Sequence, residues 1–342
     1  MQHPKGATNI EVLVNDESLV ARFSKALIEL EIREDLDAPS ACVLTLWAWD
    51  EAKNEFHVDD PLFDVGNSVA VKLGHDDELE TVLLGEIVAL EFDAQRGRAA
   101  QFSIRAYDRS HRLRRGTQQR TFANMKESDI ASQIADKNGF SAKVEDSGEA
   151  LDYVLQDNLS DYEFLQQRAA KIDYEFIVDG KELIFRPRQG QKTIALDVAK
   201  EVVEFSAQIK AMDQVGAVEV HGWDPEKKEM FVGTSANAKE APKGTDGETP
   251  FGKAKLVIVN QEVRKQAEAD QLAEAEFERR ARRSMGIEGR CWGRTDLRAG
   301  VVVDLQGAGK RFGGKYRLTS VTHQYAPRYE YWTSFSAEKE LT

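Results

Sequence analysis

The stretch from Leu159 to Arg186 constrains the fold most, because it predicts a helix followed directly by a β-hairpin. Ser160 is placed to cap the helix, and Glu163 can bond back to the Ser160 N–H, which completes a capping box. Leu159 and Phe164 occupy the two positions of a hydrophobic staple. An apolar stripe at helical spacing follows at Leu165, Ala169 and Ile172.

The residues after Asp173 predict the hairpin, because the apolar period changes there from helical spacing to two. Apolar side chains alternate on both sides of a central Asp179-Gly180 pair, at Tyr174, Phe176, Val178, Leu183 and Phe185. Asp-Gly favours a type I′ turn, whose central residues both have positive φ. Helix and hairpin together predict an α+β element in the middle of the chain.

Short strands are predicted before this element. Alternating or doubly apolar runs occur at Ile10–Val14, Ala26–Ile32, Cys42–Trp49, Val69–Leu73, Val82–Phe92 and Phe102–Ala106. Frequent turns between short strands are typical of a small sandwich or barrel. Nearer the middle, Asn124 and Glu127 form a second possible capping box, before a stripe at Ile130, Ala131, Ile134 and Ala135 that Gly139 ends.

Strands resume after Thr193, at Val202-Val203 and 216–220. Residues 224–253 read as an exposed loop, with a possible strand near Met230. We expect Asn260 to cap the longest helix, which would end near Met285 with an apolar face of Val263, Ala267, Ala273, Phe277 and Ala281. The last predicted strands are Val301–Leu305, Tyr316–Gln324 and Tyr331–Ser336.

The net charge of -13 argues against a general nucleic-acid binder, which needs a basic surface to displace counterions from phosphate. Two cysteines, Cys42 and Cys291, are too few for a disulfide framework and suggest buried, reduced thiols. We find no secretory signal at the N-terminus and no run long enough for a membrane span, so a cytoplasmic site of synthesis is expected.

No motif predicts catalysis, a cofactor or a metal site. The glycine cluster at 307–314 lacks the spacing of a dinucleotide fingerprint and the Ser or Thr of a P-loop, so a hairpin loop is the better interpretation. The metal-type side chains of His75 to Glu78 are adjacent in one turn, where neighbours rarely converge on one ion. No GxSxG elbow occurs, and His323 reads as a structural histidine within a strand.

Arginines concentrate between Arg96 and Arg120 of this acidic chain. A solvated face with local ion pairs is one interpretation, a contact surface for an acidic partner protein is the second, and a nucleic-acid contact is the third and least favoured. On the second, the candidate contact residues are Arg109, Arg112, Arg114 and Arg115.

Three stretches resemble one known family. They are AYDRSHRLRRGTQQRTFANMKESDIASQIA at 106–135, LQDNLSDYEFLQQRAAKIDYEFIVDGKELIF at 155–185 and YRLTSVTHQYAPRYEYWTSFSAE at 316–338, preceded by LRAGVVVDLQG. In this order they resemble the phage late control gene D family, the tail hub proteins related to the N-terminal part of VgrG.

The resemblance implies a mainly β, α+β chain with two small β-barrel domains and an α+β domain. The first barrel would span 8–115. The second would combine 190–225 with 287–342, and the α+β domain would combine 116–189 with 226–286. The family also implies that the two barrels are duplicates, although no sequence repeat is detectable.

The implied function is structural: a homotrimeric baseplate hub of a contractile phage tail or phage-like injection system. It would join the six-fold tail tube to a three-fold spike, and would assemble in the cytoplasm before joining the particle. The expected partners are the tube protein, a separate spike protein, since no spike-like segment follows here, and wedge or LysM-type adaptor proteins. Exposed tryptophans would suit such interfaces, and Trp47, Trp49, Trp223, Trp292 and Trp332 are candidates that core packing explains equally well. The alternative function is a tail-associated cell-wall hydrolase.

Overall fold

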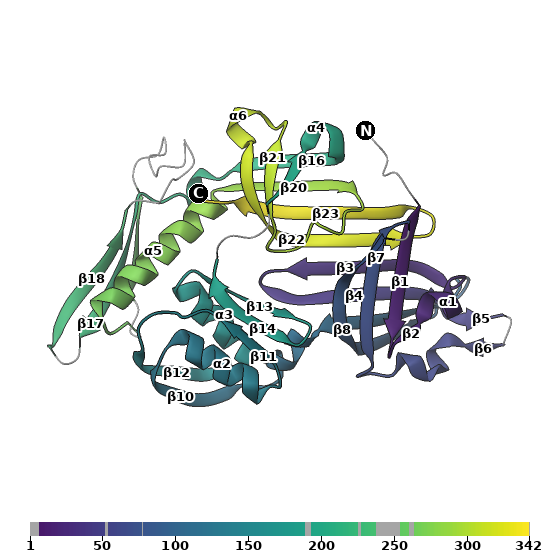
Figure 1. The fold of residues 1–342 in the computed structure, drawn as a ribbon, viewed down its shortest axis with the longest axis horizontal. Coiled ribbons are helices and arrows are strands. Elements are labelled where there is room, and N and C mark those ends of the chain that lie inside the picture. The colour runs from purple at the N-terminus through teal and green to yellow at the C-terminus, as the bar shows by residue number, and fades with distance from the viewer. Residues whose placement is uncertain are drawn as a thin grey trace.

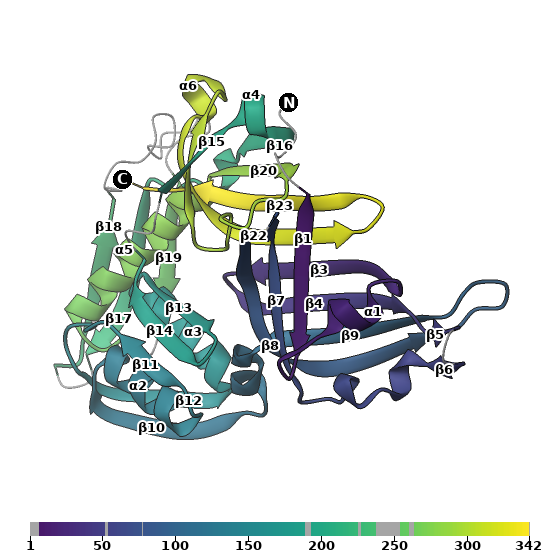
Figure 2. The same cartoon turned by 45° about the vertical axis from the view of Figure 1, so that its right-hand side comes forward.

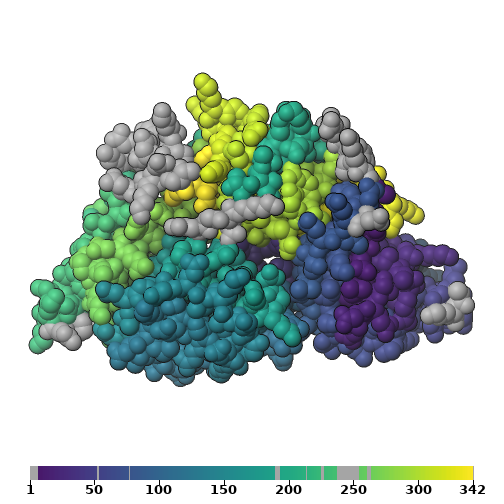
Figure 3. Space-filling view, in the orientation of Figure 1, coloured from purple at the N-terminus to yellow at the C-terminus, as the bar shows by residue number. Residues whose placement is uncertain are grey.

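The computed structural model describes residues 7–51, 54–76, 78–188, 193–224, 227–236, 254–259 and 263–341. These residues form a mainly β chain with an α+β part, as predicted (Figure 1). A long, largely antiparallel sheet combines strands from both ends of the chain. In the space-filling view, the N-terminal unit lies at the lower right, the α+β part at the lower left and the C-terminal unit above them (Figure 3).

The N-terminal unit contributes one part of the long sheet. Its strands are β1 (Thr8–Val14), β2 (Glu17–Ser18), β3 (Leu27–Asp35), β4 (Ala38–Trp47), β7 (Ser68–His75), β8 (Glu78–Asp93) and β9 (Gln101–Asp108). A separate hairpin joins β5 (Trp49–Asp50) to β6 (Glu55–Phe56), and the short helices are α1 (Leu19–Phe23), η1 (His57–Asp59), η2 (Pro61–Phe63) and η3 (Arg109–Arg114). Alternate side chains of β9 are buried, so the period-two pattern of the sequence forms the inner face of this unit.

The C-terminal unit contributes the other part of the long sheet. Its elements are β15 (Thr193–Asp197), α4 (Val198–Glu201), β16 (Val202–Ile209), β20 (Met285–Trp292), β21 (Val302–Gln306), α6 (Gly309–Phe312), β22 (Gly314–Ala326) and β23 (Glu330–Lys339). The glycine cluster connects β21 to β22, which pair as antiparallel neighbours, so its interpretation as a hairpin connection is confirmed, with one short helical turn added.

Two further groups of elements complete the chain. Between the units lie β10 (Gln118–Met125), α2 (Glu127–Lys137), β11 (Ser141–Val144), β12 (Leu151–Leu159), α3 (Asp161–Lys171), β13 (Tyr174–Asp179) and β14 (Glu182–Pro187). Inserted between β16 and β20 are η4 (Ala211–Asp213), β17 (Ala217–Asp224), β18 (Glu229–Ser235), β19 (Lys255–Val259) and α5 (Gln266–Arg283). In the insertion, α5 covers one face of the small β18-β17-β19 sheet (Figures 1 and 2).

Buried apolar residues fall into separate clusters that follow these groups. One belongs to the N-terminal unit, one to the α+β elements 113–185, one to the C-terminal unit and one to the insertion. Tyr331 is the exception, because this β23 residue is buried in the N-terminal cluster. The two β units therefore have their own cores, and Tyr325 of β22 also packs against the N-terminal cluster beside Tyr331.

The two β units have the same topology. In sheet order, β1-β7-β8-β9-β4-β3 corresponds to β15-β21-β22-β23-β20-β16. The chain order also corresponds, because each unit runs from its first strand through a short helix, α1 or α4, into β3 or β16. One difference is that β1 pairs antiparallel with β7, whereas β15 pairs parallel with β21.

Irregularities of the strand pairing repeat at corresponding positions. The β3·β4 ladder has a bulge between Leu27 and Glu29, and β16·β20 has one between Val202 and Glu204. The β8·β9 ladder has a bulge after Ile87, and β22·β23 has one after Leu318. Since a bulge adds one residue to a strand and changes its twist, these shared positions align the two units residue by residue.

The structure confirms the capping box of α3. The Glu163 N–H donates to Ser160 Oγ at 3.2 Å, and the Ser160 N–H donates to Glu163 Oε2 at 2.9 Å. The predicted turn is wrong by one position. Asp179 pairs with Glu182, so the loop is Gly180-Lys181, and Gly180 alone of the two has positive φ, at +56°. A glycine at the first of the two central positions is typical of a type II′ turn.

The other two predicted helix starts were also wrong. Helix α2 begins at Glu127, with the Lys126 N–H donating to Asp129 at 3.3 Å, while Asn124 lies in β10. Its predicted stripe and its end at Gly139, with φ +75°, are confirmed. Helix α5 begins at Gln266, and Asn260 lies outside the described residues.

The apolar face of α5 includes Ala269 in place of the predicted Ala267, which is exposed. Gly233 of β18 explains this orientation. A Cβ on Gly233 would lie 2.2 Å from the Ala269 backbone, so helix and sheet touch where neither side chain is large.

We predict that Ser160→Ala lowers the free energy of unfolding by ~1 kcal/mol, because the substitution removes the side-chain acceptor at the start of α3. Chemical denaturation of the two proteins would measure the difference. An unchanged unfolding midpoint would show that the cap contributes nothing.

Candidate assembly surfaces

The pairing of β22 with β3 joins the two β units. It runs antiparallel from Ser320 opposite Asp35 to Tyr325 opposite Leu30. The Gln324 Nε2 also donates to Glu31 Oε2 at 2.8 Å across the ladder. Because of this pairing, the strands β16-β20-β23-β22-β3-β4-β9-β8 form one uninterrupted row.

Arg298 reinforces this junction. Its Nε donates to Glu34 Oε1 at 2.5 Å, and its Nη2 donates to the Val82 carbonyl at 2.6 Å. Glu34 is only 5% exposed, and burial raises its pKa although Arg298 and the Ala299 N–H oppose the shift. A residue of the C-terminal unit therefore supplies the counter-charge of a buried carboxylate in the N-terminal unit.

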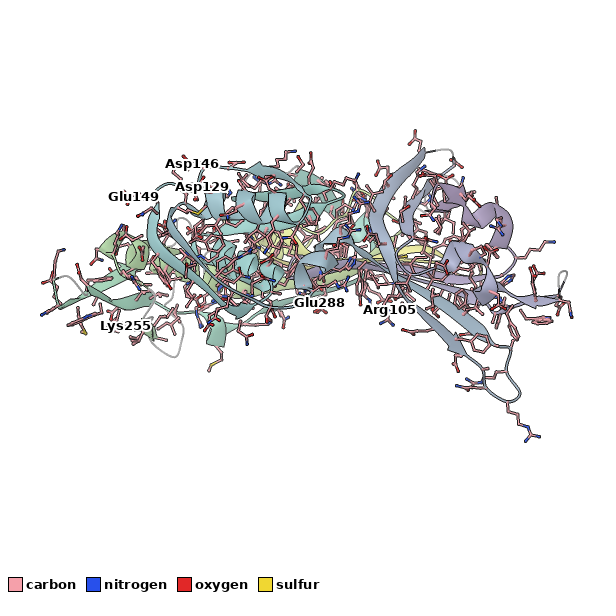
Figure 4. All side chains as sticks on the ribbon, turned by 90° about the horizontal axis from the view of Figure 1, so that it is seen from below. Arg105, Asp129, Asp146, Glu149, Lys255 and Glu288 are labelled. Atoms are coloured by element: carbon pink, nitrogen blue, oxygen red, sulfur yellow. The ribbon has the colours of Figure 1, made fainter. Side chains whose placement is uncertain are left out.

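One face of the row is polar. Side chains opposite the two cores include Ser206, Ser320, Thr322, Ser334, Ser336, Gln324, Thr45 and Ser103, together with charged residues. Its arginines are Arg33, Arg105 and Arg290, which pair with Glu31, Glu91 and Glu204. Further carboxylates lie on the same face at Glu29, Asp35, Asp93, Glu288 and Glu338, and Arg283 of α5 pairs with Glu338 there. Figure 4 labels one of its charged residues from each unit, Arg105 and Glu288.

A hollow of about 860 Å³ lies at this face, where the units meet. It is lined by residues of both units, including Arg33, Tyr107, Thr322 and Ser334. Arg114, one of the predicted contact residues, also lines it.

The four predicted contact arginines lie in or next to η3, but their surroundings differ. Arg109 and Arg112 donate to the buried Glu86, at 3.2 Å and 2.6 Å for the nearest atoms. Arg114 lies with its guanidinium carbon 4.2 Å from the centre of the Tyr162 ring in α3. Arg115 is exposed. Two of the four therefore hold η3 to β8 within the chain, as the interpretation of local ion pairs expected.

The tryptophans are all at least partly exposed. Trp47, Trp49 and Trp223 are 39–51% exposed, whereas Trp292 and Trp332 stack on each other with ring centres 4.0 Å apart. Trp49 also packs edge-on against Phe56, which packs edge-on against the exposed Phe92. These aromatic side chains form a partly exposed cluster at the end of the N-terminal unit.

The cysteines and His323 have structural environments. Both thiols are free and buried, and burial raises the pKa of each to about 12. His323 is fully buried, and the Tyr331 hydroxyl lies 2.8 Å from its Nδ1. Burial, with the nearby Arg298 charge, lowers the His323 pKa to about 3, so the ring is neutral at physiological pH.

Buried charges connect the α+β part to the C-terminal unit and to the insertion. Arg317 of β22 is 1% exposed and donates to Glu175 of β13, which also accepts from Arg186 Nε at 2.6 Å. Arg282 of α5 donates to Asp173 from a similarly buried position. By the correspondence of the units, Arg317 occupies the position of Glu86. The equivalent charge of the N-terminal unit, Glu86, instead bonds to η3 of its own unit, whose Leu113 is buried in the α+β core.

Within the described residues, no group of three or more His, Cys, Asp or Glu side chains is arranged to hold a metal ion. His75 instead places its Nε2 2.9 Å from the Gly293 carbonyl of the other unit. No helix in the described ranges is both long and apolar enough to cross a membrane.

A family model described as the Alg8 N-terminal domain matches residues 5–327. The chain belongs to the Alg8 N-terminal domain family. No curated protein matches its sequence.

Solved structures of this fold come from phage tails and related secretion machines. The 43 kDa tail protein of prophage MuSo2 from Shewanella oneidensis superposes with a TM-score of 0.74 at 14% identity, covering 97% of this chain and 98% of that one. The tail protein from Neisseria meningitidis MC58 gives 0.70 at 11% identity, with 98% and 97% covered.

The Escherichia coli protein c3393 gives a TM-score of 0.59 at 16% identity, with 96% of this chain and 76% of that one covered. It is described as a component of the type VI secretion system with structural similarity to the T4 tail proteins gp27 and gp5. This family member therefore has a phage tail-type fold.

We predict that Glu175→Gln lowers the free energy of unfolding by ~3–5 kcal/mol, because it leaves the buried Arg317 without its counter-charge. Urea denaturation would measure the loss. The matched control is Glu182→Gln, whose pair with Lys143 is exposed on both sides and should contribute ~1 kcal/mol or less. Equal effects of the two substitutions would contradict this role of Glu175.

We predict that His323 makes stability depend on pH between 7 and 5.5. Its folded pKa lies below the unfolded value of 6.5, so only the unfolded state takes up this proton in that range. The contribution is present above pH 6.5 and is lost as pH falls, by about 1 kcal/mol at pH 5.5. Denaturation of wild type and His323→Gln at both pH values would test this. Identical pH dependences would refute it.

Proposed function

We propose that the chain is a structural hub of a contractile phage tail or phage-like injection system. In this role three copies form a ring between a six-fold tail tube and a three-fold spike. We also propose that the chain is related to the phage late control gene D family, and that each β unit closes into a barrel. Assembly would take place in the cytoplasm, and the protein would then become part of the particle.

The duplicated β unit carries this proposal. Each copy presents two units with the same strand order, joined edge to edge in one row. Three copies joined in the same manner would present six equivalent units, and so would match a six-fold tube. The full-length similarity to tail proteins supports the same role.

The polar face of the row suits the inner wall of such a ring. Hydroxyl and charged side chains keep this face hydrated, and the net charge of -13 disfavours general binding of nucleic acid. The opposite side of the row packs on the two cores. A ring closed with the polar face inward would therefore need no further covering of that face.

The partners would be the tube protein, a separate spike protein and wedge or LysM-type adaptor proteins. Arg114 and Arg115 are the arginines that we propose for partner contact. Arg109 and Arg112 already bond to Glu86, so they would contact a partner only while keeping those bonds. The predicted domains remain part of this proposal: a first barrel at 8–115, an α+β domain at 116–189 with 226–286, and a second barrel at 190–225 with 287–342.

We expect the purified full-length chain to have the mass of three copies by light scattering, and to co-purify with a tube or spike protein from its own gene neighbourhood. A structural role also predicts no clearing of peptidoglycan, which the alternative of a cell-wall hydrolase requires. A monomer that clears peptidoglycan and captures neither partner would refute the hub.

A further inference from the structure

Two strand edges of the row are free in the described part of the chain. At one end, β16 pairs only with β20. At the other, β8 has β9 along one side, while β7 covers the second side only as far as Glu86. The stretch from Val88 to Asp93 therefore offers its backbone N–H and C=O groups to a further strand.

The equivalents of these two edges pair with each other inside the chain. The stretch of β22 that follows its bulge pairs with β3. It corresponds to the stretch of β8 after Val88, and β3 corresponds to β16. Each free edge therefore matches one half of a junction that the structure already contains.

We propose that β8 of one copy pairs antiparallel with β16 of a second copy, in the register of the β22·β3 junction. The number of copies in this inference rests on the proposed function. The choice of strands and their register rest on the internal β22·β3 junction alone. Translating the register through the shared bulges places Ala89 opposite Lys210, Leu90 opposite Ile209, Glu91 opposite Gln208, Phe92 opposite Ala207 and Asp93 opposite Ser206.

The side chains at the two edges complement each other in this register. On the core side, Phe92 and Ile209 are 49% and 40% exposed in the single chain, and each would meet an apolar partner. On the polar side, Glu91 and Asp93 would meet Gln208 and Ser206, which can donate hydrogen bonds. No like charges would lie directly opposite each other in these pairs, and opposed like charges would destabilise the ladder.

The two edges differ from each other, so the contact is heterologous. Each copy would use its β8 edge toward one neighbour and its β16 edge toward the other. Such contacts continue from copy to copy until the rotation closes a ring. Closure would leave no free edge in the row, which removes a surface prone to uncontrolled strand pairing.

A register-specific disulfide tests this interface. We would prepare the full chain with Glu91→Cys and Gln208→Cys, oxidise it, and separate the products on a non-reducing gel. Paired strand residues lie within the Cα separation that a disulfide needs. The native Cys42 and Cys291 are buried and should not compete. We expect cross-linked species up to three copies.

The matched control keeps Glu91→Cys but moves the second cysteine to Glu204, which lies on the same face four residues away. That displacement is ~13 Å along the strand, so the control should not cross-link. In a separate variant, Ile209→Lys places a charge against Leu90 of the neighbour, and should reduce assembly without lowering the melting temperature of the single chain.

The outcomes separate this inference from the proposed function. A three-copy mass without the disulfide between positions 91 and 208, or with equal cross-linking of the control, would overturn the strand pairing and leave the hub intact. A single-copy mass with neither cross-link would overturn both. The specific disulfide in a protein that captures no tube or spike protein would support the interface and count against the hub.

Discussion

The pairing of β22 with β3 is the contact on which the rest of the structure depends. Without it, the chain would be two small β units connected through the α+β elements. With it, hydrogen bonds continue from one unit to the next, and the two cores lie close enough for Tyr331 of β23 to be buried in the N-terminal core. The Arg298–Glu34 pair then fixes the junction from the side, because each charge is poorly solvated without the other.

Buried charges attach the α+β part to this frame, together with Leu113 of η3, whose apolar side chain is buried in the α+β core. Glu86 holds η3 through two arginines, and Arg317 at the corresponding position of the second unit holds β13 through Glu175. The two positions carry opposite charges and bind different elements. Buried ion pairs contribute modest net stability, since desolvation offsets much of the attraction, but they penalise any arrangement in which a partner is missing. They therefore suit a joint whose orientation must be specific.

Local signals in the sequence predicted local structure well. The capping box at Ser160, the α2 stripe and most strands depend on residues close together in the chain, and their patterns were readable. The start and orientation of α5 could not be read from the sequence in this way. Its contact with Gly233 is tertiary, and this contact determines which alanines face the sheet. The turn at Gly180 was misplaced because pairing of Asp179 with Glu182 decided the loop.

The duplication was invisible in the sequence for a different reason. Equivalent positions carry unlike residues, such as Glu86 and Arg317, or Phe92 and His323. What the units share is backbone geometry, above all the two bulges, and no residue type identifies a bulge reliably. The exposed arginines were found from composition, but which of them bond within the chain depends on where Glu86 lies.

The position of the insertion has a consequence for symmetry. At one end of the strands, both units have a plain hairpin, β8–β9 or β22–β23, and the N-terminal unit adds the small β5–β6 hairpin beside its own (Figure 2). At the opposite end, β3 turns directly into β4, whereas β16 is followed by the whole insertion with α5. In a ring closed as proposed, the long hairpins would repeat with every unit at one rim, and the insertion would repeat with every second unit at the other. The change from six-fold to three-fold order would then occur along the length of the strands, without any subunit adopting two conformations.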